Sequence, residues 1–192
     1  MKVTRSMLEQ DARYLLNSVR DADYEIPSSG AVFKTIFKVY GCVFFIQLAG
    51  VLADWVIYAR RGDYYSYSDM AILSTVSLVV VFAVLCVMLY QNVSLALCIP
   101  EDVRNNSLIC KIIRRKLRSY FVAVVLFNML VALILLFLGH RHVSYLGASW
   151  FVSLGIASIC FSYSTARYFT PQVMSVIDKI AEVIAPSVTE NK

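Results

Sequence analysis

Three polar side chains interrupt otherwise apolar stretches, and they are the residues whose types could do chemistry. Gln47 and Asp54 lie seven residues apart in one apolar run, and Asn128 lies at the centre of another. An ionisable residue inside a membrane is costly to bury and is therefore a functional-site hypothesis. Asp54, however, lies four residues from the end of its run and close to Arg60 and Arg61. An ion pair with an arginine at the membrane interface is the favoured interpretation, and a proton or ion relay is the alternative.

Gln47 and Asn128 are expected to hold helices together. Counted from the same side of the membrane, Gln47 is the ninth residue of its run and Asn128 the tenth, so their depths match. We therefore predict a hydrogen bond between the two amides, worth about 0.6 kcal/mol by the average for such bonds in membranes. In the last apolar run, Ser149, Ser153 and Ala157 form a small-residue face that permits close helix approach.

Histidine and serine residues give a weaker indication of chemistry. His140 or His142 would activate Ser149 in an intramembrane serine protease, and the two histidines together would hold a metal. However, Trp150 stands where a glycine usually follows such a serine, and no carboxylate or cysteine joins the histidines on that side. Zinc-protease, P-loop and dinucleotide motifs are also missing. The sequence therefore predicts a protein that is not an enzyme, with no catalytic, cofactor-binding or metal-binding residues.

The elements that carry these residues are predicted by composition. The chain of 192 residues is 59% hydrophobic and 16% charged, against about 25% charged in soluble proteins, and its mean hydropathy is +0.66. Four runs are almost free of charge, and a helix needs roughly 20 apolar residues to cross the membrane. The runs lack the alternation of barrel strands. We predict an all-α polytopic membrane protein with transmembrane helices at about 39–58, 71–90, 119–138 and 144–166.

Lysine and arginine residues predict the orientation. Fifteen of them belong to the two tails and to the loop at 91–118, whereas three, Arg60, Arg61 and Arg141, lie on the other side. Because cytoplasmic loops carry the excess of such residues, both termini and the 91–118 loop are predicted to be cytoplasmic. The net charge of +5 then needs no nucleic-acid partner. The basic cluster at 114–118 also lies where it can meet anionic headgroups.

Segments outside the membrane show helical periodicity. Residues 1–35 are predicted to form a cytoplasmic segment with an amphipathic helix at 6–22, and residues 169–192 a second amphipathic segment. Between them lies the transmembrane domain, 36–168, whose cytoplasmic loop contains another short helix that starts after Pro100. Such helices lie on the membrane surface or pack on each other.

The predicted outer loop at 59–69 is rich in tyrosine. Tyrosines at this depth are usually interfacial anchors, and a recognition surface is the alternative. The candidate outer recognition residues are Arg60, Arg61, Tyr64, Tyr65, Tyr67 and Arg141.

One segment resembles a known family. An acidic stretch that contains Asp21, Asp23 and Glu25, then Ile26-Pro27, then Lys34 and the first apolar run, is similar to the TraS entry-exclusion proteins of F-type conjugative plasmids. The similarity covers residues 15–27 (LLNSVRDADYEIP) and the overall hydropathy. It implies a protein of the bacterial inner membrane with no catalytic residues. Such a protein blocks redundant conjugative transfer by recognising the donor cell's TraG protein in a plasmid-specific way.

Two other functions fit the same sequence. One is a membrane subunit of a conjugation or secretion apparatus, and the other is a small transporter or channel, for which Asp54 is the evidence. The expected partners are the lipid bilayer and either a TraG-like donor protein or another membrane protein. Oligomerisation is compatible with the sequence.

Overall fold

The computed structural model describes residues 4–21, 27–58, 64–139 and 142–184, and these ranges are helical with no strand. Four helices are long and apolar enough to cross a membrane: α2 (Ser29–Tyr58), α3 (Tyr64–Cys98), α5 (Leu108–Leu138) and α6 (Leu146–Ala166). The shorter elements are α1 (Arg5–Asp21), α4 (Glu101–Asn106), the 3-10 helix η2 (His142–Tyr145) and α7 (Pro171–Ile184). The predicted all-α fold with four membrane-spanning helices is confirmed.

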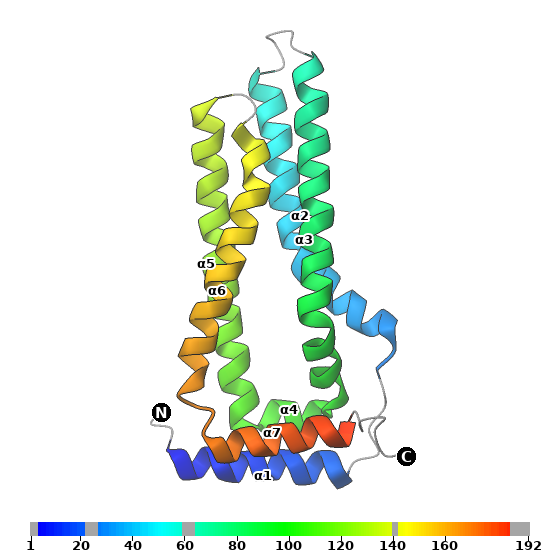
Figure 1. Cartoon of the computed structure of the whole chain (residues 1–192), viewed down its shortest axis with the longest axis vertical. Helices are drawn as coiled ribbons and strands as arrows, with labels where there is room; N and C mark the ends of the chain where they lie inside the picture. Colours follow the sequence, from blue (N-terminus) through cyan, green and yellow to red (C-terminus); the bar gives the residue numbers. More distant parts are fainter. Residues whose placement is uncertain (1–3, 22–26, 59–63, 140–141, 185–192) are drawn as a thin grey trace, which may run out of the picture.

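The four long helices form two hairpins, α2 with α3 and α5 with α6, which stand side by side (Figure 1). Helices α1 and α7 run next to each other across one end of this bundle, together with α4 (Figure 1). We call α1, α4 and α7 the base layer. At the opposite end, η2 connects α5 to α6.

The long helices extend further toward the base layer than predicted. Helix α2 begins at residue 29 rather than 39, and α5 begins at 108 rather than 119, whereas their far ends agree with the prediction at 58 and 138. Hydropathy marks the part of a helix in hydrocarbon, but the helix continues until a residue breaks it. Here α3 ends shortly before Pro100, and Ser107 caps α5. The predicted loop at 91–118 is therefore mostly helical, and the short helix expected after Pro100 ends at Asn106.

The bundle packs along a seam that α2 shows clearly. Its buried residues follow a spacing of three and four positions, with Tyr40 half-buried in the same series. This is the heptad spacing of helices that pack side by side with knobs in holes. The buried residues of α2 are Val32, Ile36, Val43, Gln47, Gly50 and Asp54.

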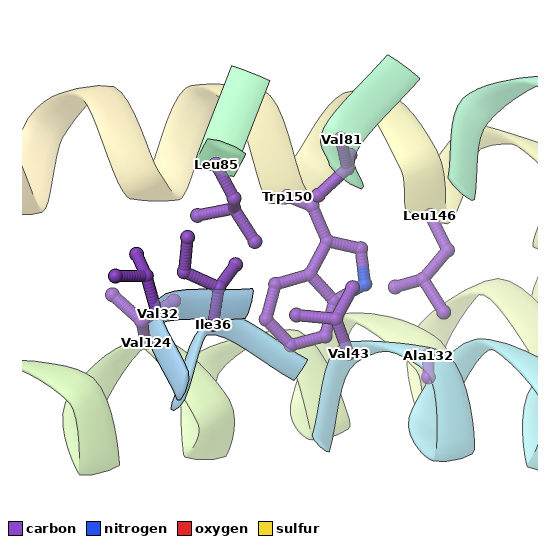
Figure 2. Packing of buried hydrophobic residues seen from close by; sticks show 9 residues of the cluster. All are labelled: Val32, Ile36, Val43, Val81, Leu85, Val124, Ala132, Leu146 and Trp150. Atoms are coloured by element: carbon purple, nitrogen blue, oxygen red, sulfur yellow. The ribbon is translucent and has the colours of Figure 1, made fainter. Parts of the chain in front are cut away.

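An indole ring fills the space between the hairpins. Trp150 of α6 is 1% exposed, and Figure 2 shows it among Val43 of α2, Val81 of α3 and Leu146. Aromatic side chains bury a large apolar area. This contact therefore joins one hairpin to the other through the middle of the bundle.

The base layer has a core of its own. Along α1, Leu8, Ala12, Leu15 and Val19 recur at helical spacing, and all four are buried. They pack with Ile109 at the start of α5 and with Val173 and Ile180 of α7. The apolar faces of α1 and α7 thus pack on each other and on α5, which is one of the two arrangements expected for amphipathic segments.

Helices α3 and α6 approach each other closely at Gly147. A Cβ atom added there would lie 2.4 Å from the Cβ and Oγ atoms of Ser77 in α3. By contrast, a Cβ added at Gly155 of the same helix would meet nothing within 4 Å. The absence of a side chain at Gly147 is therefore what allows this helix crossing.

We predict that Gly147→Ala destabilises the purified protein by about 1–3 kcal/mol, because the added methyl group overpacks the crossing. Gly155→Ala is the matched control, and it should be neutral or stabilising by roughly 0.5–1 kcal/mol because alanine favours the helix. Thermal unfolding in detergent, followed by circular dichroism, measures both. Equal melting temperatures for the two variants would contradict the close approach.

Candidate functional site

A group of buried polar side chains lies in the bundle, on the halves of the helices that are remote from the base layer. Its members come from all four long helices and are nearly inaccessible: Gln47, Asp54, Ser74, Asn128 and Ser153. We call this group the polar layer. A polar group in an apolar environment is costly unless it is hydrogen-bonded, so the partners within the layer decide what it does.

Asn128 forms its hydrogen bonds within its own hairpin, α5 and α6. Its Nδ2 atom donates to Ser153 Oγ at 2.8 Å and to the Val124 carbonyl at 2.9 Å, and its Oδ1 atom accepts from Ser149 Oγ at 2.8 Å. The amide therefore uses both donors and an acceptor. Two of these three bonds connect α5 to α6.

Gln47 is bonded within the other hairpin. Its Nε2 atom donates to Ser74 Oγ of α3 at 3.4 Å, and its Oε1 atom is buried without a hydrogen-bond partner among the described residues. The predicted bond between Gln47 and Asn128 is wrong, because both donors of Asn128 are already engaged inside the α5/α6 hairpin. Each amide closes one hairpin instead of joining the two.

Sequence reasoning missed the serines as partners. The sequence places Ser149 and Ser153 on a small-residue face and offers Ser149 as a possible nucleophile, but it indicates neither of them, nor Ser74, as a partner of an amide. The available signal was that the helix paired with each amide in its hairpin carries a serine hydroxyl.

Besides Gln47 Oε1, the buried polar atom Trp150 Nε1 also has no partner in the described ranges. An unsatisfied buried group costs about 1–3 kcal/mol, so Gln47 Oε1 and Trp150 Nε1 each lower the stability of the bundle.

Asp54 is completely buried on the α2 seam, one heptad beyond Gln47. This burial places a carboxyl group inside the bundle, not on its surface. Arg60 and Arg61, its predicted ion-pair partners, lie outside the described residues. The ion pair and the proton or ion relay both stay predictions.

The candidate outer recognition residues cannot be placed as a surface. Arg60, Arg61 and Arg141 lie outside the described residues. The backbone at Tyr64, Tyr65 and Tyr67 is helical and belongs to the first turns of α3, so the predicted loop at 59–69 is shorter than expected. The side chains of these tyrosines are outside the described part of the structure.

The described residues Ser149 and His142 do not form the serine–histidine pair expected of a protease. Ser149 Oγ donates to Asn128, and His142 Nδ1 lies 3.1 Å from the carbonyl oxygen of Gly139. Among the described residues, no group of three His, Cys, Asp or Glu side chains with metal-binding geometry occurs.

One carboxylate fastens the base layer to the bundle. Asp11 of α1 accepts hydrogen bonds from Ser107 Oγ and from the backbone N–H of Ile109, each at 2.8 Å, and from Leu108 N–H at 3.0 Å. These donors form the N-terminus of α5, where unsatisfied N–H groups and the helix dipole favour a negative charge. Asp11 is therefore a helix cap supplied by another helix.

Sequence analysis missed this role, although a signal was present. Asp11 lies three residues after Leu8 and four before Leu15, so it occupies the apolar face of α1. A charged residue on an apolar face requires a partner, and here the partner is the end of α5.

Further contacts tie the base layer to both hairpins. Arg5 of α1 donates to Gln172 Oε1 of α7 at 2.5 Å, which aligns the starts of these two helices. Arg104 of α4 donates to the carbonyl oxygen of Ala96 at 3.2 Å, near the end of α3. With Asp11 on α5, the layer holds the first hairpin through α3 and the second through α5.

We predict that Asn128→Leu destabilises the protein by about 1–2 kcal/mol, because three bonds of about 0.6 kcal/mol are lost. Gln47→Met should be neutral or stabilising, since it removes one long bond together with an unsatisfied acceptor. Thermal unfolding in detergent measures both variants. A Gln47→Met variant that loses as much stability as Asn128→Leu would contradict the assignment.

We also predict that Asp11→Asn weakens the attachment of α1 to α5. It should lower the free energy of unfolding by about 1–3 kcal/mol, because hydrogen bonds to a charged group are lost. Glu9→Gln is the matched control in the same helix. Among the described residues its carboxylate meets only the exposed Arg5 side chain, at 2.7 Å, a kind of pair worth less than about 1 kcal/mol. Hydrogen exchange at residues 107–112 should accelerate in Asp11→Asn and not in Glu9→Gln. Equal exchange in the two variants would exclude the capping role.

Comparison with known proteins adds no relative. No protein-family model matches the chain, and neither a curated protein nor a solved structure matches it. The chain is a multi-pass membrane protein by its four long apolar helices.

Proposed function

We propose that this chain acts in the bacterial inner membrane through recognition of another protein, and that its role is plasmid entry exclusion. Both termini and the base layer then face the cytoplasm, in agreement with the distribution of lysine and arginine. The observation that carries the proposal is the base layer itself. It is a folded surface outside the apolar spans, held to both hairpins by Asp11 and Arg104.

The exposed side of this layer supports recognition. Because α1 buries its apolar face against α7 and α5, its other face is free, and it presents Gln10, Arg13, Tyr14 and Asn17. Tyr14 is 44% exposed, and tyrosine and arginine are enriched where proteins bind each other. This surface has a defined position on the bundle, since Asp11 of α1 caps α5 and the apolar face of α1 packs on α7.

The segment that resembles TraS proteins belongs in part to the same layer. Residues 15–21 form the last turns of α1, in which Leu15 and Val19 are buried. The resemblance therefore falls on residues that shape the base layer. It supports a recognition surface built on α1, with a TraG-like protein of the donor as the partner.

A membrane subunit of a conjugation or secretion apparatus is the second candidate, because the same base layer would dock such a subunit. The two functions differ in the cell that needs the protein. Exclusion acts in the recipient, whereas an apparatus subunit is required in the donor.

The test is a mating experiment with recipients that express this chain alone. They should accept the cognate plasmid far less often than empty recipients, and a plasmid of another exclusion group should enter normally, because specificity is a difference between affinities. Equal transfer into expressing and empty recipients would exclude entry exclusion. Reduced transfer on deletion from the donor would favour the apparatus subunit.

Variants then locate the recognition surface. Tyr14→Ala should weaken exclusion without changing the abundance of the protein, and Tyr163→Ala is the control, since Tyr163 is 80% exposed on the spanning helix α6. Arg61→Glu and Arg141→Glu test the opposite end of the bundle. Loss of exclusion confined to these two arginine variants would place recognition on the outside and would contradict the role of the base layer.

A further inference from the structure

The basic cluster at 114–118 divides between two faces of α5. Lys116 points to the inner face, where its Nζ atom donates to the carbonyl oxygen of Ser164 at 2.8 Å and to Ser164 Oγ, and lies 5.1 Å from the ring centroid of Tyr168. Arg115 and Arg118 are exposed on the outer face. The basic cluster of the sequence therefore divides in two: Lys116 contacts α6, and Arg115 and Arg118 form a separate exposed pair.

The outer pair forms no ion pair with an acidic side chain in the described structure. Arg5 with Glu9 is the ion pair found within the described ranges, and Arg115 and Arg118 make no hydrogen bond there. The neighbouring Arg114 donates to Asn105 Oδ1 of α4 at 3.1 Å. The pair consequently presents uncompensated positive charge to its surroundings.

The same face of α5 continues as an apolar stripe. Lys111, Arg115 and Arg118 are followed at spacings of three and four by further exposed residues, which share one side of the helix. Those residues are Val122, Leu126, Met129, Leu133 and Phe137. Phe137 is 89% exposed and Leu126 59%, so this side of α5 faces the lipid.

The length of the stripe fits the membrane. From Arg118 to Phe137 the helix rises about 29 Å, at about 1.5 Å per residue, and the hydrocarbon core is about 30 Å thick. Arg118 then lies at the boundary of the hydrocarbon, and Arg115 and Lys111 lie in the headgroup region. Residues three apart on a helix are neighbours, so Arg115 and Arg118 can both donate to one phosphate.

We propose that Arg115 and Arg118 form a binding site for an anionic phospholipid, whose acyl chains lie along Val122 and Leu126. The occupant is a lipid because the cations pass directly into an exposed apolar stripe of membrane length. A free phosphate would use the arginines alone and leave the stripe unexplained. The site is independent of exclusion, since it lies on the outer face of α5 and not on α1.

Native mass spectrometry of the full-length protein, purified in detergent and mixed with equal amounts of phosphatidylglycerol and phosphatidylcholine, tests the site. The unaltered chain should retain phosphatidylglycerol in preference. Arg115→Gln/Arg118→Gln should reduce this retention by about 25-fold, because each of the two cations near an anionic surface contributes about a factor of five. Arg115→Lys/Arg118→Lys should retain most of it, since the charge is kept.

The matched control is Arg13→Gln/Arg20→Gln, which removes the same charge from two exposed arginines of α1. It should keep phosphatidylglycerol retention within about twofold of the unaltered chain, as expected for charges that do not contact the lipid. Equal loss in both double variants, or equal retention of the two lipids, would overturn the proposal. Displacement of the lipid by millimolar inorganic phosphate would identify a free-phosphate site instead and would overturn it as well.

Discussion

Polar groups in the hydrocarbon region have no water to bond, and most of this structure follows from that constraint. Helices satisfy the backbone, and the buried side chains that remain polar must find partners on a neighbouring helix. Asn128 finds them in Ser149 and Ser153, and Gln47 finds one in Ser74. Because these partners belong to the adjacent helix of the same hairpin, the bonds of the two amides stabilise the two hairpins separately.

The two hairpins are joined by a hydrogen bond from the Tyr58 hydroxyl of α2 to the carbonyl oxygen of Leu136 in α5, at 3.0 Å, and by packing. Trp150 packs between α2 and α3 in the middle of the bundle, and Gly147 allows α6 to approach Ser77 of α3. Apolar packing and close approach carry helix association in membranes, where the hydrophobic effect between helices is weak. The base layer adds a second connection, because Arg104 reaches the end of α3 and Asp11 caps the start of α5.

This arrangement separates two surfaces with different partners. The apolar faces of α1 and α7 are used inside the protein, so their polar faces are available for a protein partner under the proposed function. The outer face of α5 carries arginines and then exposed apolar residues, which suits a lipid. On the inner face of the same helix, Lys116 donates a hydrogen bond to α6. Neighbouring cations in one short segment therefore have different roles.

The sequence by itself determined the fold class, the four spans and the far ends of α2 and α5, because hydropathy is a local property. It also determined the apolar stripe of α1, since Leu8, Ala12, Leu15 and Val19 show their period without any partner. Only the tertiary structure decided what each polar residue bonds. Gln47 and Asn128 match in depth and yet bond elsewhere, and Asp11 caps a helix that begins about a hundred residues away in the chain. Hydrogen bonds depend on which helices are neighbours and on which donors are already used. That information arises only when the helices have packed.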